Sequence, residues 1–204
     1  MALIQRIGFL ASGAGSTFEA VVAACRAGDL PLDPVVIIGN NGEAGVFDRA
    51  QRLGVTALHI SAKTTGDAVA ADAAIAAALD NAKIDLVVLA GYLKMLGPAV
   101  LAAFEGRIIN THPALLPKFG GPGMYGRNVH SAVLAASETA TGVTVHIVDK
   151  EYDHGPVLAQ TTLLVEPDDT IETLAARVQA YEKPFLVETL GRLARGELEL
   201  PKVA

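Results

Sequence analysis

The chain has 204 residues, of which 51% are hydrophobic and 19% are charged, and its formal net charge is -6 at pH 7. A chain of this length and composition can bury a sizeable core, which excludes a disordered protein and indicates one domain over residues 1–204. The acidic balance argues against a general surface for nucleic acid or anionic membranes, although backbone N–H groups could still bind a small anion locally.

The sequence also lacks the markers of several special classes. The single cysteine, Cys25, cannot form an internal disulfide, and its apolar helical surroundings predict a buried thiol. No cluster of Cys and His has the spacing of a structural zinc site. The segment Met1–Leu10 has no charged n-region or cleavage site, and no apolar run approaches the roughly 18 residues of a membrane span. We therefore expect a cytoplasmic protein without a metal or a membrane segment.

Predicted strands and helices alternate in the first half of the chain. Short apolar runs predict strands over Ile7–Ala11, Val35–Ile38, Thr56–Ile60, Leu86–Ala90 and Arg107–Ile109. Helical patterns and propensities predict helices over Phe18–Ala27, Ala44–Leu53, Asp67–Asn81 and Ala99–Phe104. This alternation predicts a parallel sheet with right-handed crossovers.

The pattern changes after Pro117. It comprises a Gly/Pro-rich loop over Lys118–Arg127, a helix over Val129–Ala136, β-rich segments over Gly142–Val148 and Pro156–Val165, and a last helix from Thr170 towards Leu193. The two β-rich segments are joined by the short charged turn Asp149–Gly155, so they predict an antiparallel pair at the edge of the sheet. The fold class expected is α/β: a Rossmann-like, mostly parallel sheet with an antiparallel C-terminal extension and helices on both faces.

Two polar side chains follow the strand that ends at Ile109. Pro113 stops that strand, so Asn110 and His112 are expected at the mouth of the sheet, where open α/β folds bind their ligands. Their i, i+2 spacing points both side chains the same way. Asn donates a hydrogen bond without charge, and His moves protons near neutral pH, so the pair suits an oxyanion stabiliser beside a general acid or base. The alternative is a polar strand end with a solvated histidine.

Two glycine-rich segments are candidates for ligand binding. Ser12–Thr17 lies between a predicted strand and helix, where backbone N–H groups suit a phosphate, although it could also be only a tight turn. Phe18 occupies the third position of the dinucleotide fingerprint, which is therefore broken. Gly121–Gly126 matches G-x-G-x-x-G but does not follow a strand, so we predict a mobile active-site loop there.

The segment Asp149–Pro156 holds three carboxylates and a histidine. One carboxylate could face His112 and raise the pKa of its imidazole, or the segment could be a solvated charged hairpin. A structural or surface role is the default for His59, His130 and His146, although His146 could approach the site from a neighbouring strand.

The segment Asn110-x-His112-Pro113-x-Leu115-Leu116-Pro117, with Asp153-x-Gly155-Pro156-Val157 downstream, resembles the formyltransferase family that uses 10-formyltetrahydrofolate. The turn that begins Ser12-Gly13-x-Gly15-Ser16 narrows the resemblance to members that formylate phosphoribosylglycinamide in purine synthesis. The resemblance runs from Ile7 to about Leu198. It implies an enzyme with two small-molecule substrates, 10-formyltetrahydrofolate and phosphoribosylglycinamide, no metal, and no nucleic-acid or membrane partner. A monomer or homodimer is expected.

The resemblance also implies roles for single residues. His112 is the expected general acid/base, Asn110 stabilises the oxyanion of the tetrahedral intermediate, and Asp153 raises the pKa of His112 and fixes a water for proton relay. The implied binding residues are Gly15, Ser16 and Thr17 for the phosphate, Gln179 and Glu182 for the rest of the ribotide, and Leu93, Lys94, Met95, Leu96, Asn110 and the backbone from Asp149 to Asp153 for the folate. Lys94 stands where the family has an Arg, and no Arg lies near Gly66–Ala68, so altered folate contacts are expected.

Two alternatives stay open. A related folate-dependent enzyme could act on another amine, such as a sugar amine; a tRNA enzyme is expected to add a C-terminal domain, and a deformylase an N-terminal one. From a different class, a non-catalytic nucleotide-binding module would keep the fold without turnover. The presence of Asn110, His112 and Asp153 argues against that module.

Overall fold

The computed structural model describes residues 4–201, which form a seven-stranded sheet and its covering helices. The strands are β1 (Arg6–Ala11), β2 (Asp33–Gly39), β3 (Thr56–His59), β4 (Leu86–Leu89), β5 (Ile108–His112), β6 (Ala140–Ile147) and β7 (Val157–Leu164). The helices are α1 (Ser16–Ala27), α2 (Val46–Arg52), α3 (Ala62–Thr65), α4 (Ala68–Asn81), α5 (Pro98–Ala103), α6 (Arg127–Ala135) and α7 (Ile171–Ala194).

The sheet has the strand order β3-β2-β1-β4-β5-β6-β7. Neighbouring strands from β3 to β5 are parallel, whereas β6 runs antiparallel to β5, and β7 runs antiparallel to β6. The predicted fold class is therefore confirmed, including the antiparallel extension.

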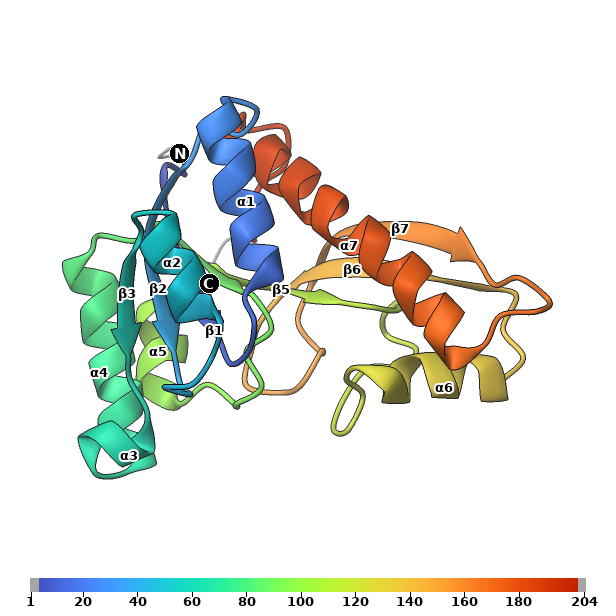
Figure 1. Ribbon diagram of the computed structural model, residues 1–204, viewed down its shortest axis with the longest axis horizontal. Coiled ribbons are helices and arrows are strands. Elements are labelled where there is room, and N and C mark those ends of the chain that lie inside the picture. Colours follow the sequence, from blue (N-terminus) through green and yellow to red (C-terminus); the bar gives the residue numbers. More distant parts are fainter. Residues whose placement is uncertain (1–3, 202–204) are drawn as a thin grey trace.

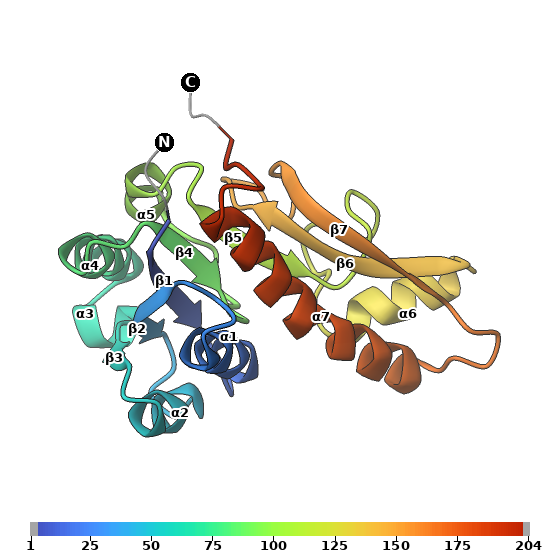
Figure 2. The ribbon, with the colours of Figure 1, turned by 90° about the horizontal axis from the view of Figure 1, so that it is seen from above.

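Two apolar layers hold the helices against the parallel part of the sheet. Successive side chains of a strand point to opposite faces, so Phe9 of β1 packs in one layer and Leu10 in the other. The first layer joins the sheet to α1, α2 and α7, and the second joins it to α4 and α5 (Figures 1 and 2).

A third, smaller cluster fixes the helices around the antiparallel strands. Val133 of α6 and Val178 of α7 meet the sheet residues Val143 and Leu163 there. This cluster holds α6 against α7, although β6 and β7 separate the two helices in the sequence (Figure 2).

The observed elements differ from the predicted ones mainly at their ends. The strand predicted to stop at Ile109 continues through His112 as β5, because pairing with β6 extends it up to Pro113. The short helix α3 was missed; its N-cap Ser61 exchanges hydrogen bonds with Thr64 in a capping box, a signal carried by Ser and Thr alone. Among the described residues, no helix is long and apolar enough to cross a membrane. Cys25 is half-buried, and burial raises the pKa of its thiol to about 11.

Candidate active site

The site begins with the pairing of β5 and β6. In this antiparallel ladder Asn110 lies opposite His146, and His112 lies opposite Thr144. Directly opposed residues project from the same side of a sheet, so His146 is brought to the two side chains predicted to be functional. His146 therefore approaches the site from the neighbouring strand, which is the alternative considered for it in the sequence.

Asn110 and His146 are in hydrogen-bond contact. Asn110 Nδ2 lies 3.2 Å from His146 Nε2, and His146 Nδ1 lies 2.9 Å from the carbonyl oxygen of Ile147. A carbonyl only accepts, so Nδ1 of His146 donates to Ile147, while its Nε2 faces the Asn110 amide. This contact fixes which way the Asn110 amide points and leaves its second N–H free to donate.

His112 is buried rather than solvated at a strand mouth, since only 3% of the residue is exposed. Its Nε2 donates to the carbonyl oxygen of Phe119 at 2.7 Å, and its Nδ1 lies 3.5 Å from Oδ2 of Asp153. The carboxylate predicted to face His112 is therefore in contact with it. The other carboxylate oxygen of Asp153 lies 3.5 Å from Nε2 of His146, so Asp153 sits between two imidazoles.

Burial and charge act on His112 in opposite directions. Burial lowers the pKa of His112, while the Asp153 carboxylate and the bond to Phe119 raise it; burial is the largest effect, and the net pKa lies below the ordinary value of 6.5. The expected rise is thus wrong in sign, although Asp153 does act upwards. The pKa of Asp153 is lowered: its own burial opposes this, but His146, His112 and the Gly121 N–H together outweigh it.

The backbone around this pair is held in an unusual conformation. Phe119 has φ +57° and Asp153 has φ +53°, in the left-handed region that residues other than glycine rarely adopt. The N–H of Gly121 donates to Oδ2 of Asp153 at 3.1 Å. The loop after Pro117 is therefore bound to both members of the pair, and such strain is typical of functional sites.

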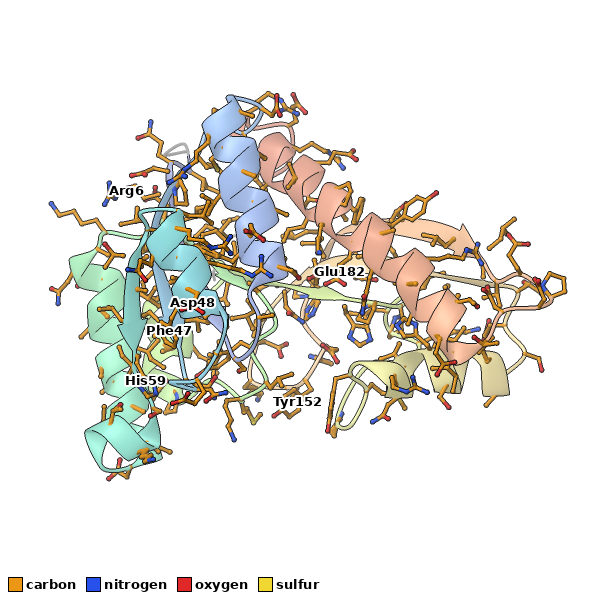
Figure 3. All side chains as sticks on the ribbon, in the orientation of Figure 1. Arg6, Phe47, Asp48, His59, Tyr152 and Glu182 are labelled. Atoms are coloured by element: carbon orange, nitrogen blue, oxygen red, sulfur yellow. The ribbon has the colours of Figure 1, made fainter. Side chains whose placement is uncertain are left out.

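A cavity of about 440 Å³ opens beside the pair. Asn110 and Asp153 border it, and α7 contributes Gln179 and Glu182. Glu182 reaches from α7 towards β5 (Figure 3), where Thr111 Oγ1 donates to it at 3.0 Å, and burial raises the pKa of its carboxyl group. The residues that complete the lining are Gly91, Tyr92, Leu93, Thr111, Pro113, Gly121, Gly123, Met124, Tyr125, Gly126, His130 and Tyr152.

The predicted phosphate turn does not border this cavity. Gly15, the N-cap of α1, has φ +77°, and α1 packs against α7, which carries Gln179 and Glu182. The first N–H groups of α1, on Ser16 and Thr17, have no partner within the helix, as at every helix start. The position of Gly121–Gly126 in the cavity lining agrees with an active-site loop.

The predicted folate residues form a different part of the site. Leu93 borders the main cavity, whereas Lys94, Met95 and Leu96 line an adjoining cleft with Asp149 and Asp153. Leu93 and Met95 are 66% and 56% exposed, which is unusual for large apolar side chains and suits a ligand face.

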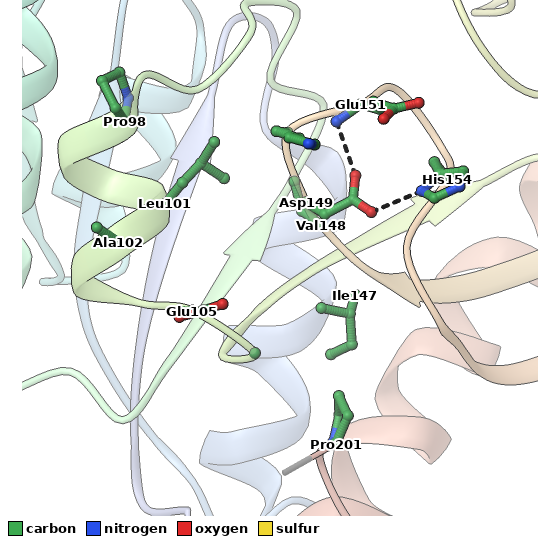
Figure 4. A pocket seen from close by; sticks show the side chains of 12 residues that line it. Pro98, Leu101, Ala102, Glu105, Ile147, Val148, Asp149, Glu151, His154 and Pro201 are labelled. Atoms are coloured by element: carbon green, nitrogen blue, oxygen red, sulfur yellow. Dashed lines mark hydrogen bonds and ion pairs between the residues drawn. The ribbon is translucent and has the colours of Figure 1, made fainter. Parts of the chain in front are cut away.

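The segment from Asp149 to His154 turns around one carboxylate. Asp149 accepts from the N–H of Glu151 at 2.8 Å and contacts Nδ1 of His154 at 2.9 Å (Figure 4). Between this segment and α5 lies a further cavity of about 670 Å³, whose floor includes Leu101 and Val148. Asp149 thus shapes the loop rather than offering a free carboxylate.

His130, for which a structural or surface role is the default expectation, is 2% exposed and borders the main cavity. Its signal was the spacing within a predicted helix, since His130 lies three residues before the core residue Val133. Among residues 4–201, no three His, Cys, Asp or Glu side chains are grouped so as to hold a metal ion.

Comparisons with known proteins identify the family of the chain. A family model described as "Formyl transferase" matches residues 5–190. The chain is 36% identical to the chloroplastic phosphoribosylglycinamide formyltransferase of Arabidopsis thaliana over 96% of this chain and 67% of that protein. It is 32% identical to phosphoribosylglycinamide formyltransferase of Haemophilus influenzae over 97% of this chain and 91% of that protein.

A solved structure gives the same assignment at the level of the fold. Glycinamide ribonucleotide transformylase 1 from Symbiobacterium toebii superposes with a TM-score of 0.88 at 36% identity, covering 97% of this chain and 91% of that one. Because the family model covers most of the chain and these relatives match it over nearly its whole length, the chain belongs to the formyl transferase family, in the group that contains the phosphoribosylglycinamide formyltransferases.

Proposed function

We propose that this chain transfers a formyl group from 10-formyltetrahydrofolate to the amine of 5-phosphoribosylglycinamide in purine synthesis. The observation that carries the proposal is the contact between His112 and Asp153 beside Asn110, at the edge of a cavity large enough for a small substrate. The names of the relatives support the choice of substrates.

In formyl transfer to an amine, the protein must stabilise negative charge on an oxygen and must move a proton. The carbonyl oxygen of the formyl group gains negative charge as the amine attacks, and the free N–H of Asn110 can donate to it without bringing a charge of its own. The amine must also lose a proton, which His112 can accept at Nδ1, the ring nitrogen beside Asp153. The carboxylate then stabilises the imidazolium that forms. A proton is then returned to the folate nitrogen as its bond to the formyl carbon breaks, so that tetrahydrofolate leaves and the formylated amine remains.

The acceptor amine is proposed to bind on the α7 side. Gln179 and Glu182 line the cavity there, and the N-terminus of α1, with Gly15, Ser16 and Thr17, is proposed to hold the phosphate through backbone N–H groups. The carboxyl group of Glu182 offers oxygens to substrate hydroxyls.

The folate is proposed to bind along Leu93–Leu96 and the backbone from Asp149 to Asp153. The cleft there is lined by Tyr92, Leu96 and Val148 together with Asp149 and Asp153. Apolar and polar side chains therefore lie close together, which fits a flat ring carrying amide-like edges. When bound, 10-formyltetrahydrofolate supplies the formyl group. Lys94 could meet an anionic part of it as a point charge.

We propose that residues 1–204 form a single formyltransferase domain, working in the cytoplasm as a monomer or homodimer without nucleic acid or membrane. Sedimentation of the purified chain, with and without substrates, measures the oligomeric state.

The test is a turnover assay with purified chain, phosphoribosylglycinamide and 10-formyltetrahydrofolate, following both the deformylated folate and the formylated ribotide. Stoichiometric formation of both products is expected. Release of formate without an acceptor would favour a deformylase, formylation of a sugar amine instead would favour the alternative acceptor, and no turnover with retained binding would favour a non-catalytic module. Asp153→Asn serves as the matched low-activity control.

A further inference from the structure

One buried histidine in the cavity lining has no part in the mechanism above. His130 lies in the first turns of α6, three residues before Val133, so it shares a helix face with a member of the cluster that joins α6 to α7. It borders the same cavity as Gln179 and Glu182, the α7 residues proposed to hold the acceptor. It does not border the cleft formed by Lys94–Leu96.

The imidazole of His130 has hydrogen-bonding capacity that the described residues leave unused. Its Nδ1 is sealed from solvent and has no partner among residues 4–201. Its Nε2 is not sealed in this way, and the cavity is the open space that the residue borders. Because Nδ1 is sealed, a partner that enters from the cavity could bind the ring only at Nε2, and such a bond would give a buried side chain the hydrogen bond that it otherwise lacks.

The charge state of the ring decides what that partner can be. Burial and the neighbouring His112 both lower the pKa of His130, so the ring is neutral near pH 7 and has one N–H and one acceptor nitrogen. A proton on the sealed Nδ1 would have no acceptor among the described residues, whereas a proton on Nε2 can be donated into the cavity. A neutral donor in a cavity that the Glu182 carboxyl group also lines favours an uncharged oxygen over a phosphate.

We propose that His130 is a positioning residue for the acceptor substrate, its Nε2–H donating a hydrogen bond to an uncharged amide or hydroxyl oxygen of that molecule. Within this cavity His130 on α6 would donate a hydrogen bond to the substrate, and Glu182 on α7 would accept one from the same molecule. The inference rests on the proposed function, because it needs a substrate with such an oxygen.

The experiment compares His130→Phe with wild type in steady-state kinetics, varying each substrate in turn. Phenylalanine keeps a buried planar ring but removes both nitrogens. We expect the KM for phosphoribosylglycinamide to rise by at least about tenfold and the KM for 10-formyltetrahydrofolate to change less than about twofold. The melting temperature should be unchanged or higher, because no protein hydrogen bond is lost. His130→Gln, which keeps a donor, should recover part of the acceptor affinity.

His59→Phe is the matched control, since His59 is exposed and lies beside Phe47, away from Glu182 (Figure 3). An acceptor KM within about twofold of wild type in folded His130→Phe would overturn the inference, and so would an equal rise in both KM values with a lower melting temperature, which indicates packing alone. If His130→Phe does not fold, His130→Met is judged by the same criteria. Failure of the wild type to turn over would instead count against the proposed function.

Discussion

His112 is held at both of its ring nitrogens, and this determines how it can work. Because Nε2 donates to the carbonyl of Phe119, the neutral ring has its basic atom at Nδ1, which faces Asp153. Burial disfavours the charged ring and Asp153 favours it, and burial has the larger effect. The residue is therefore neutral near pH 7 and ready to accept a proton that Asp153 then helps it to hold.

Replacing Asp153 by Asn should lower the pKa of His112 further. The carboxylate is the largest influence that raises this pKa, and removing it leaves burial unopposed by charge. NMR titration of the His112 ring in both proteins measures the effect. A His112 pKa that is unchanged or higher in the Asp153→Asn variant would show that the contact at 3.5 Å carries no electrostatic coupling.

The variant His112→Gln should lose roughly two to four orders of magnitude in kcat, the usual range for a general acid or base. It should also unfold at a somewhat lower temperature, because His112 is buried and its bond to Phe119 is disturbed. Activity within threefold of wild type would exclude His112 as the base.

The same variant should show a changed pH dependence of stability. The folded-state pKa of His112 lies below 6.5, so the unfolded chain takes up the proton first as pH falls. The contribution of His112 to stability is complete above about pH 6.5 and is lost as pH falls through its folded pKa. Urea unfolding between pH 7 and pH 5 should thus lose stability less steeply in the variant than in wild type.

At the scale of elements, the turn from β1 into α1 combines two different glycines. A Cβ on Gly15 would lie 2.4 Å from Cγ2 and 3.1 Å from Cα of Val46, and its φ of +77° is unfavourable for any side chain. A Cβ on Gly13 would meet nothing within 4 Å. The packing of α1 against α2 therefore requires a glycine at position 15, whatever the turn binds. A side chain at position 13 has no such packing cost, so the effect of substituting Gly13 measures ligand binding at the turn.

Gly13→Ala should keep the melting temperature of wild type but weaken phosphoribosylglycinamide binding, because its methyl group would occupy open space at the proposed phosphate turn. Gly15→Ala should instead cost about 1–3 kcal/mol of folding stability. Calorimetric titration and thermal unfolding of both variants separate the two effects. Wild-type ribotide affinity in Gly13→Ala, or equal affinity for the dephosphorylated riboside, would contradict a phosphate site here.

Local pattern predicted the elements well, and long-range pairing accounts for what it missed. The strand and helix order, and the antiparallel pair, follow from apolar periodicity and turn residues that lie close in sequence. The positions of His146 and His130 at the cavity and its neighbouring strands depend instead on the β5–β6 register and on the packing of α6 against α7. The alternation of side chains along β6 does indicate that His146 lies near the site. Thr144 and His146 lie on the face of the strand opposite to Val143, Val145 and Ile147.

The direction of the His112 pKa could not be predicted either. The sequence showed an acidic segment able to reach His112, but not how deeply the ring would be buried by the loop that carries Phe119. Such burial is a property of the assembled structure and competes with the charge of Asp153.

At the scale of the whole molecule, the residues proposed to bind the two substrates lie on different elements. Helix α7 with Glu182 contributes one wall of the site, and the segment after β4 with Lys94 contributes another. Asn110 and Asp153 border both spaces, so the reacting groups can meet at β5 while the rest of each substrate is held separately. Sites with no shared partner usually contribute additively.

Glu182→Gln and Lys94→Ala should therefore impair different substrates. Glu182→Gln should weaken phosphoribosylglycinamide binding by about tenfold, because the amide replaces one acceptor oxygen with a donor beside Thr111. Lys94→Ala should weaken 10-formyltetrahydrofolate binding by about two- to fivefold, as expected for an exposed charge. Titration calorimetry with each ligand alone measures both, with Tyr181→Phe as an exposed control on α7. In the double variant each ligand should lose the same affinity as in the corresponding single variant, within about 0.5 kcal/mol. A larger difference would mean that the two ligands share one wall.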